Sequence, residues 1–205
     1  MTLRVRFAMS LAISALAVPA FAQSTIFTSS AAFLANVQPG YYTEGFEGSA
    51  GSGSASISFT GGSAPFSYIV TSIGGSNAVY RNGLIGSVSS NASVTISFTG
   101  GKPTAIGGNF FVTDVNDNFL ALPVTVNLSD GTSVSYTPTS AGDYRGFIST
   151  VSISSLTMAA PTNGSFNVLD NLTVGLAANA PEPGSLALLA LGGIGGAAIL
   201  RRRTK

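Results

Sequence analysis

The stretch DVNDNF at positions 114–119 gathers side-chain oxygens of the kind that bind hard cations. Carboxylate and amide oxygens are the ligands that Ca²⁺ prefers. The stretch begins like an EF-hand loop, but Phe119 stands where that loop needs glycine and Thr125 where it needs a bidentate glutamate. An EF-hand is therefore excluded, and a hairpin turn that uses the geometry of Asn and Asp competes with a calcium site of the β-sandwich type. The candidate calcium ligands are Asp114, Asn116, Asp117, Asn118 and, brought near by folding, Asp170 with Asn171.

Two carboxylates, Glu44 and Glu47 in YYTEGFEG, raise the question of acid–base chemistry. Glycoside hydrolysis needs two carboxyl groups about 5–9 Å apart across a cleft. A spacing of three residues in a glycine-flanked extended segment favours a solvated turn instead. The chain has no His and no Cys, which excludes Ser-His-Asp triads, thiol nucleophiles and zinc sites. We therefore expect no catalytic residue, and a small glycan hydrolase that uses two of the acidic residues is the enzymatic alternative.

Aromatic side chains are candidates for sugar binding, because a flat ring offers an apolar face with specific geometry. The chain has no Trp, so tyrosines would have to serve. Tyr80-Arg81 and Tyr144-Arg145 lie beside expected loops, whereas tyrosine in a strand also packs without any ligand. Both interpretations remain open. The tyrosines are Tyr41, Tyr42, Tyr68, Tyr80, Tyr136 and Tyr144.

Charge is distributed unevenly along the 205 residues. Between positions 23 and 180 the only basic residues are Arg81, Lys102 and Arg145, against seven acidic ones, so this part carries about 3 − 7 = −4. A mildly acidic domain repels phosphate backbones, which excludes nucleic acid as a partner. The remaining basic residues lie near the two ends of the chain.

The first 22 residues have the order of a signal peptide. A basic start with Arg4 and Arg6 precedes an apolar run, and Ala20 and Ala22 form an A-x-A cleavage signal. We expect export through the Sec translocon and the inner membrane, with Gln23 as the first residue of the mature chain. An exported chain without cysteine has no disulfide bonds, so its stability must come from its core or from bound ions.

The last 27 residues combine a rigid link, an apolar run and a cluster of arginines. Pro181 and Pro183 favour an extended conformation on either side of Glu182. Residues 185–200 are uncharged, and as a helix they would rise about 24 Å, somewhat less than the ~30 Å hydrocarbon layer. The arginines keep the end of the chain on the cytoplasmic side. This membrane stop comprises Arg201, Arg202 and Arg203 within the basic tail 201–205.

These three elements together resemble the PEP-CTERM sorting signal of Gram-negative bacteria, a segment that is also called an ice-binding protein C-terminal domain. That label describes the tail and is no evidence of ice binding. The resemblance implies recognition by an exosortase in the membrane and cleavage near Pro181, Glu182 and Pro183. It also implies transient membrane anchoring, then a location at the cell surface or outside the cell, commonly alongside exopolysaccharide.

The middle of the chain has the patterns of an all-β protein. Short apolar runs alternate with polar residues and are separated by Gly, Asn, Asp and Pro. Only residues 31–37 and the two ends favour helix. The expected strands are 55–60, 66–71, 92–99, 105–113, 119–128, 132–137, 147–153 and 166–174.

Alternating strands favour one buried and one solvated face, so the sequence predicts a two-sheet antiparallel β-sandwich of jelly-roll or lectin-like type. The expected organisation is a signal peptide at 1–22, the β-sandwich ectodomain at 23–178 and the sorting signal at 179–205. The leading functional hypothesis is a non-catalytic surface protein associated with exopolysaccharide, without an obligatory cofactor. An adhesin or ice-binding-like module is a further alternative, and it would need a regular Thr-rich face.

Overall fold

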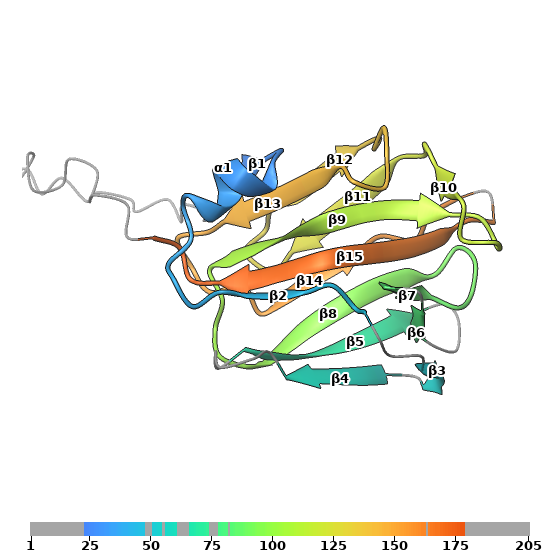
Figure 1. Ribbon diagram of the computed structural model, residues 1–205, viewed down its shortest axis with the longest axis horizontal. Helices are drawn as coiled ribbons and strands as arrows, with labels where there is room; N and C mark the ends of the chain where they lie inside the picture. Colours follow the sequence, from blue (N-terminus) through green and yellow to red (C-terminus); the bar gives the residue numbers. More distant parts are fainter. Residues whose placement is uncertain are drawn as a thin grey trace, which may run out of the picture.

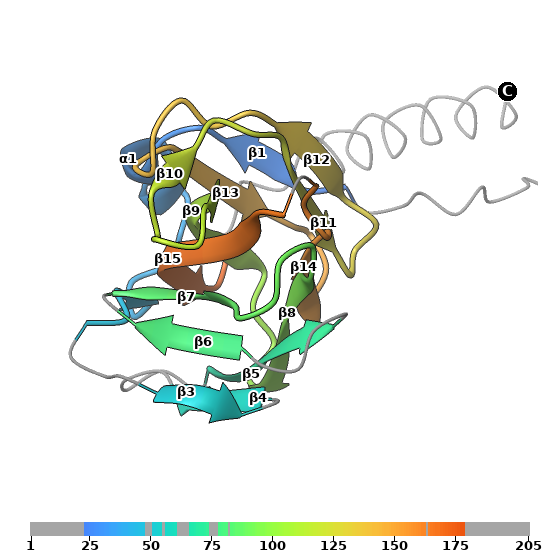
Figure 2. The same ribbon diagram turned by 90° about the vertical axis from the view of Figure 1, so that its right-hand side faces the viewer.

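The computed structural model describes residues 23–47, 51–54, 56–60, 66–73, 78–81, 83–162 and 164–178. These residues form two antiparallel β-sheets that pack face to face, with one short helix (Figure 1). Figure 2 shows the layers edge-on, with β13, β9 and β15 on one side and β11, β14 and β8 on the other. The predicted all-β, two-sheet sandwich is confirmed.

The six-stranded sheet has the order β12-β11-β14-β8-β5-β4. Its strands are Ser133–Tyr136 (β12), Val124–Leu128 (β11), Ser155–Met158 (β14), Ser93–Gly100 (β8), Ser67–Ile73 (β5) and Ser56–Thr60 (β4). In β11, Val124, Val126 and Leu128 are buried while Thr125 and Asn127 are partly exposed. Successive side chains of a strand point to opposite faces, so the alternation in the sequence sets which face meets the core.

The nine-stranded sheet has the order β1-β13-β9-β15-β7-β6-β3, and β10 and β2 pair with β9 and β15. Its strands are Thr25–Phe27 (β1), Tyr144–Ile148 (β13), Ala105–Thr113 (β9), Phe166–Gly175 (β15), Leu84–Ser87 (β7), Ala78–Arg81 (β6), Gly51–Ser54 (β3), Phe119–Leu120 (β10) and Tyr42–Glu44 (β2). Every residue of β9 is buried, because this central strand is covered on both of its faces.

The core lies between the two sheets. Phe110 and Leu169 of the nine-stranded sheet meet Tyr68, Ile96 and Leu156 of the six-stranded sheet, and all of them are at most 1% exposed. Burying a large apolar side chain contributes about 1.5–3 kcal/mol. This core is therefore the main source of stability in a chain without disulfide bonds.

The outer face of the nine-stranded sheet carries helix α1, Ser30–Leu34. Phe33 of α1 is fully buried and contacts Tyr144 of β13, with ring centroids 5.8 Å apart. A Cβ atom at Gly146 would lie 2.4 Å from the Phe33 ring, and one at Gly107 would lie 2.0 Å from the Tyr144 hydroxyl. Glycine in β9 and β13 thus leaves the room in which these two aromatic rings pack against the sheet.

The structure corrects several predicted boundaries. The strand expected over 119–128 is divided into β10 and β11, since Pro123 lacks the N–H that a continuous strand needs. The strand expected over 147–153 occupies Tyr144–Ile148 instead, and a separate strand, β14, follows. The helix is shorter than predicted, because residues 35–37 form a turn and a β-bridge between Val37 and Ala177.

The predicted signal peptide and sorting tail, including Ala20, Ala22, residues 181–183 and residues 201–203, lie outside the described residues. Within the part of the chain that is described, no helix has the length and apolar character needed to span a bilayer.

Candidate functional sites

The predicted cation loop at 114–118 is a tight turn between β9 and β10. Asp114 Oδ1 accepts hydrogen bonds from the backbone N–H groups of Asn116 (2.8 Å) and Asn118 (2.9 Å), and Oδ2 accepts one from Asn118 Nδ2 (2.9 Å). Asp117 has a positive φ of 64°, which Asp tolerates better than most residues. Hydrogen bonds from the Asn118 side chain and backbone lower the pKa of Asp114. The segment therefore forms a turn built on the side chains of Asp114 and Asn118, and the calcium site stays a prediction.

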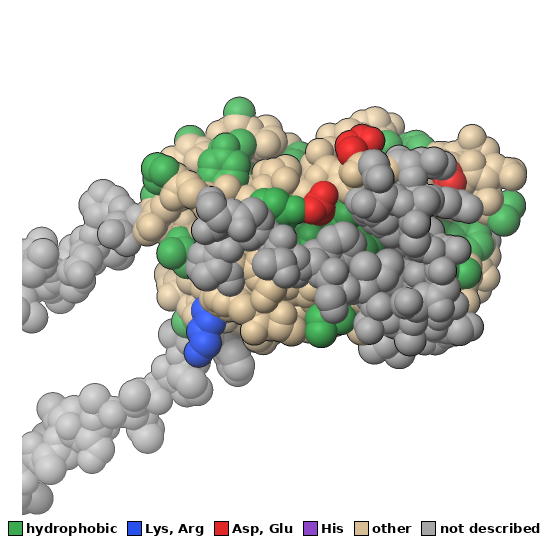
Figure 3. Space-filling view, turned by 60° about the horizontal axis from the view of Figure 1, so that its bottom comes forward, with side chains coloured by type: hydrophobic (Ala, Val, Ile, Leu, Met, Phe, Trp, Pro, Cys, Tyr) green, Lys and Arg blue, Asp and Glu red, His purple; other side chains and the backbone are tan. Residues whose placement is uncertain are grey.

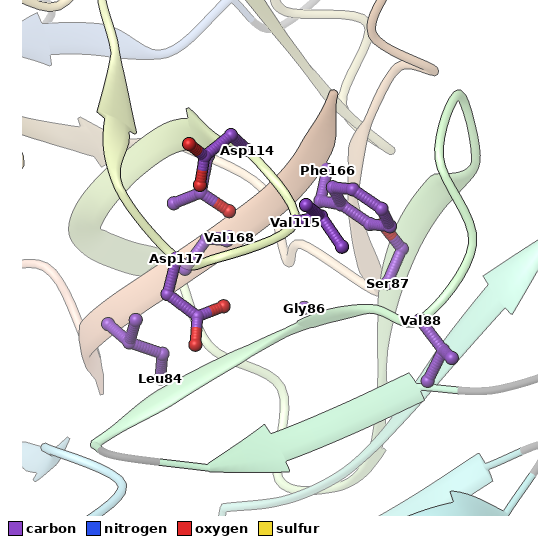
Figure 4. Close-up of a pocket in the computed structure, with 10 residues that line it drawn as sticks. Leu84, Gly86, Ser87, Val88, Asp114, Val115, Asp117, Phe166 and Val168 are labelled. Carbon is purple, nitrogen blue, oxygen red and sulfur yellow. The ribbon is translucent and has the colours of Figure 1, made fainter. Parts of the chain in front are cut away.

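Beside this turn lies an apolar hollow of about 140 Å³ on the outer face of the nine-stranded sheet (Figure 4). Asp117 points its carboxylate into the hollow from one side, and Val115 and Phe166 lie across from it. Leu84, Val88 and Val168 complete the apolar walls (Figure 4). These walls supply few of the oxygen ligands that Ca²⁺ needs.

Asp170 lies apart from the 114–118 turn. In the β9–β15 register it is opposite Asn109, whereas Phe166 is opposite Thr113 at the start of the turn. Four residues of strand separate the two positions by about 13 Å. Burial raises the pKa of Asp170, the N–H of Asn171 opposes that shift, and the nearby Glu47 adds to it. Among the residues that the structure describes, no three acidic side chains gather closely enough to hold a metal ion.

Glu44 and Glu47 lie in different surroundings. Glu44 belongs to β2, and its carboxylate accepts hydrogen bonds from the Tyr42 hydroxyl and from the N–H of Phe46 (2.9 Å). The latter bond supports Phe46, which has a positive φ of 53°. Glu47 is exposed and lies next to Gly83. Glu44 therefore has a structural role in a turn.

The tyrosines fall into different environments. Tyr68 is a core residue, and the Tyr136 ring carries the guanidinium of Arg145 at 3.9 Å from its centroid. Tyr144 is 93% buried against α1, since only 7% of it is exposed, and Tyr41 is 41% exposed. Tyr144 and Tyr41 alone among these four border the same cavity.

That cavity, here called the polar hollow, measures about 670 Å³ and lies on the outer face of the nine-stranded sheet between α1, β2 and the 139–143 loop. Its floor and walls include Tyr41, Thr43, Asn109, Asp143, Tyr144 and Asn171. Of these residues the sequence pointed only to the tyrosines and Asn171. The others, Thr43, Asn109 and Asp143, come from segments far apart in the chain, and only their polar or acidic character was visible in advance.

The polar groups of the hollow are held in place by one another. Asn171 Nδ2 donates to Asn109 Oδ1 (3.0 Å), and Asn109 Nδ2 donates to the carbonyls of Gly142 (2.9 Å) and Asp143 (3.2 Å). Asn171 lies in a β-bulge of β15 with a positive φ of 51°, which turns its side chain toward Asn109. The N–H of Thr139 donates to the Asp143 carboxylate and, together with hydroxyl groups, lowers the pKa of Asp143.

A second surface covers the outer face of the six-stranded sheet. We call it the hydroxyl face: the outward residues of β12, β11, β14, β8 and β5. The register aligns Ser133, Asn127, Thr157, Thr95 and Thr71 in one row across these strands. Neighbouring hydroxyl groups of the row form hydrogen bonds, as between Thr95 Oγ1 and Thr157 Oγ1 at 2.9 Å. The other members whose burial is described are Ser135, Thr125, Ser155, Ser93, Ser97, Thr99, Ser67 and the apolar residue Ile69.

The hydroxyl face carries no charged side chain among these described residues. Charge is also sparse on the face seen in Figure 3, where red and blue side chains are few among tan and green atoms. The fold and these surfaces define a small β-sandwich module with one uncharged polar face and one polar cavity.

Residues 179–203 match the family model of the PEP-CTERM protein-sorting motif, which confirms the resemblance predicted from the tail. The chain thus carries the signal of an exported protein that is anchored transiently in the membrane and processed there by exosortase. Neither the comparison with curated proteins nor that with solved structures found a match.

Proposed function

We propose that the protein is a non-catalytic module of the cell surface or extracellular matrix that binds neutral extracellular polysaccharide through its hydroxyl face. The observation that carries this proposal is the row Ser133, Asn127, Thr157, Thr95 and Thr71, which presents hydrogen-bonding groups without charge. A soluble surface is commonly designed with about 25–35% charged residues, and this five-strand face has none among its described residues. Sorting by exosortase would bring this face to the matrix.

Hydroxyl rows suit an extended sugar polymer because each contact is weak and the contacts repeat. Neighbouring strands are about 4.8 Å apart, so the rows offer a hydrogen-bonding group at each step across the sheet. Many weak contacts on one polymer act together through a high effective concentration. The surface therefore needs no deep pocket to hold a chain.

The experiment is adsorption of the mature protein to the native matrix polysaccharide, measured by co-sedimentation. Thr157→Glu introduces a charge at the centre of the hydroxyl face and should reduce the bound fraction strongly. Ser90→Glu, at an exposed turn between β7 and β8, is the matched control and should bind normally. Equal binding by both variants would refute a role for the hydroxyl face.

A Thr-rich row also favours, as a second candidate, an adhesin or ice-binding-like module. A rigid crystal lattice demands a flat array, whereas strands of a sheet rotate by about 20–25° relative to their neighbours. This twist favours a flexible polymer over ice. If the same preparation showed thermal hysteresis, the ice-binding alternative would be favoured instead.

The hydrolase alternative needs two convergent carboxylates. Among the described residues that border the polar hollow, Asp143 alone carries a carboxylate, and that group holds the 139–143 loop. This favours binding over hydrolysis. Release of reducing ends from the bound polysaccharide would support the enzymatic alternative.

A further inference from the structure

The polar hollow is a second surface feature, separate from the hydroxyl face because it lies on the outer side of the opposite sheet. It combines amides at Asn109 and Asn171, hydroxyl groups at Thr43 and Thr173, and the half-exposed ring of Tyr41. Concave sites that bind small molecules pair an apolar or aromatic wall with a few fixed polar groups. The composition of the hollow fits that description.

The hydroxyl of Tyr144 makes no hydrogen bond although it is buried at the edge of this hollow. The hydroxyls of Thr173 and Ser30 lie close enough to oppose the effect of burial on its pKa, but neither meets the geometry of a hydrogen bond to it. Burial raises the pKa of Tyr144 to about 12, so the group stays protonated and able to donate. A buried hydroxyl that donates no hydrogen bond costs free energy, so its presence here indicates that a ligand accepts that hydrogen bond.

The surroundings of Tyr144 hold its ring in one position. The Tyr144 hydroxyl occupies the space that a side chain at position 107 would fill, and Phe33 packs against the Tyr144 ring. Ser30 is exposed at the rim of the hollow, where its short side chain can change rotamer. Fixed polar groups lose little freedom when a ligand binds, which favours affinity.

The charge of the hollow restricts the ligand. Asp143 is ionised at neutral pH, because hydrogen bonds from Thr139 lower its pKa, and no basic side chain borders the hollow among its described residues. Of the described cations, Arg145 stacks on Tyr136, and Lys102 precedes β9 at the end of that strand opposite Asp114. Uronates, sulfates and phosphates would therefore be repelled by the Asp143 carboxylate, although Arg145 lies within electrostatic range of that group.

We propose that the polar hollow binds a single uncharged sugar unit, that the Tyr41 ring contacts its face, and that the Tyr144 hydroxyl donates a hydrogen bond to one of its oxygens. The ligand of this site is a chain end or a branch, because α1, β2 and the 139–143 loop border the hollow and favour one unit over a continuous polymer. Recognition here is independent of adsorption through the hydroxyl face.

The test uses the mature protein purified from the producing cells and calorimetric titration with short oligosaccharides. The probes are neutral oligomers of glucose, galactose, mannose and N-acetylglucosamine, together with an oligogalacturonate. At least one neutral oligomer should bind, and the acidic one should not. Binding of none of the neutral oligomers, or equal binding of the oligogalacturonate, would overturn the proposal.

Two variants separate recognition from structure. Tyr144→Phe removes a hydroxyl without a partner, so we expect an unchanged or higher Tm and a rise of about three- to tenfold in Kd for the bound oligomer. Tyr136→Phe removes a hydroxyl that donates to the Phe110 carbonyl at 2.9 Å, so we expect a lower Tm and an unchanged Kd. Wild-type affinity in Tyr144→Phe would refute its role, and so would a large loss of Tm in that variant. Adsorption to the matrix polysaccharide, measured separately with Thr157→Glu, reports only on the hydroxyl face.

Discussion

Asp130 fastens the first described residues of the chain to the β11–β12 turn. Its Oδ2 accepts a hydrogen bond from Ser24 Oγ (2.6 Å) and its Oδ1 one from the N–H of Thr132 (2.9 Å), while the Ser24 N–H donates to Thr132 Oγ1 (2.8 Å). Burial of Asp130 opposes ionisation, but the hydrogen bonds from Ser24, Thr132 and Ser149 outweigh it and lower the pKa. The ionised carboxylate is therefore the form that the folded state favours.

A pH dependence of stability follows from that lowered pKa. A carboxylate whose folded pKa lies below its unfolded value of 3.8 stabilises the protein above that pH, and the gain is lost as the pH falls through the folded pKa. We expect Tm to fall below about pH 4, and Asp130→Asn to cost about 1 kcal/mol at pH 7, a value discounted for exposure. Thermal unfolding from pH 7 to pH 2.5 measures both. If Asp130→Asn left the curve of the parent protein unchanged, the anchoring role would be wrong.

Whether the protein binds Ca²⁺ also depends on single residues. Both Asp114 oxygens already accept hydrogen bonds within the turn. Asp170 lies about 13 Å along β15 from Phe166, the residue that pairs with Thr113 at the start of the turn. We therefore expect no heat of binding and no shift of Tm when Ca²⁺ is added at millimolar concentration. Calorimetric titration is the measurement, with Asp117→Asn as the comparison. Saturable heat that disappears in Asp117→Asn would restore the calcium hypothesis.

At the scale of elements, α1 is held on the sheet by contact between Phe33 and Gly146. The Cβ of alanine at position 146 would come within 2.4 Å of the Phe33 ring, and the atoms that it meets are Cδ2, Cγ and Cβ of Phe33, which cannot move without the whole side chain. We expect Gly146→Ala to cost about 1–3 kcal/mol through overpacking. Gly142→Ala is the control, because a Cβ there meets only Ser140 Oγ at 3.7 Å. Equal denaturation midpoints for the two variants in urea would contradict this packing.

Strands with strict alternation were predictable from the sequence, and strands without it were not. The boundaries of β9 agree with the prediction over 105–113, and the hairpin of β11 and β12 follows from Asp130-Gly131 between alternating runs. β1 and β2 have three residues each and pair with distant strands. Local patterning cannot reveal such strands, since their stability comes from partners far along the chain.

The candidate sites were less predictable than the fold. Alternation indicated that Thr95 and Thr125 face solvent, but the row that joins Thr71, Thr95 and Thr157 depends on the order β14-β8-β5. The polar hollow depends likewise on how residues 28–30, 41–43 and 171–173 meet. Tertiary order, which a single sequence does not specify, creates both surfaces.

At the scale of the whole molecule, the two proposed surfaces lie on opposite outer faces of the sandwich, with the core between them. A polymer held on the six-stranded sheet would leave the polar hollow open to a second chain. Such an arrangement would cross-link matrix strands, because one molecule would contact two of them at once.

The end of the folded domain lies close to the sorting motif. The last described hydrogen bonds are those from Gln38 N–H to the Leu176 carbonyl (2.8 Å), from Ala177 N–H to Thr104 Oγ1 (2.8 Å) and from Ala178 N–H to the Asn36 carbonyl (2.8 Å). The PEP-CTERM match begins at residue 179, directly after them. Cleavage at or beyond this boundary leaves every one of these bonds intact.

We therefore expect mass spectrometry of the secreted protein to show a C-terminus between residues 180 and 183. The 23–178 fragment should unfold at the same temperature as the secreted form, because both keep the bonds of residues 176–178. The 23–175 fragment loses those bonds and the bridge between Val37 and Ala177, at a cost of about 2 kcal/mol. A secreted form that ends before Ala178, or equal unfolding temperatures for the two fragments, would show that processing reaches into the fold and that the domain boundary is wrong.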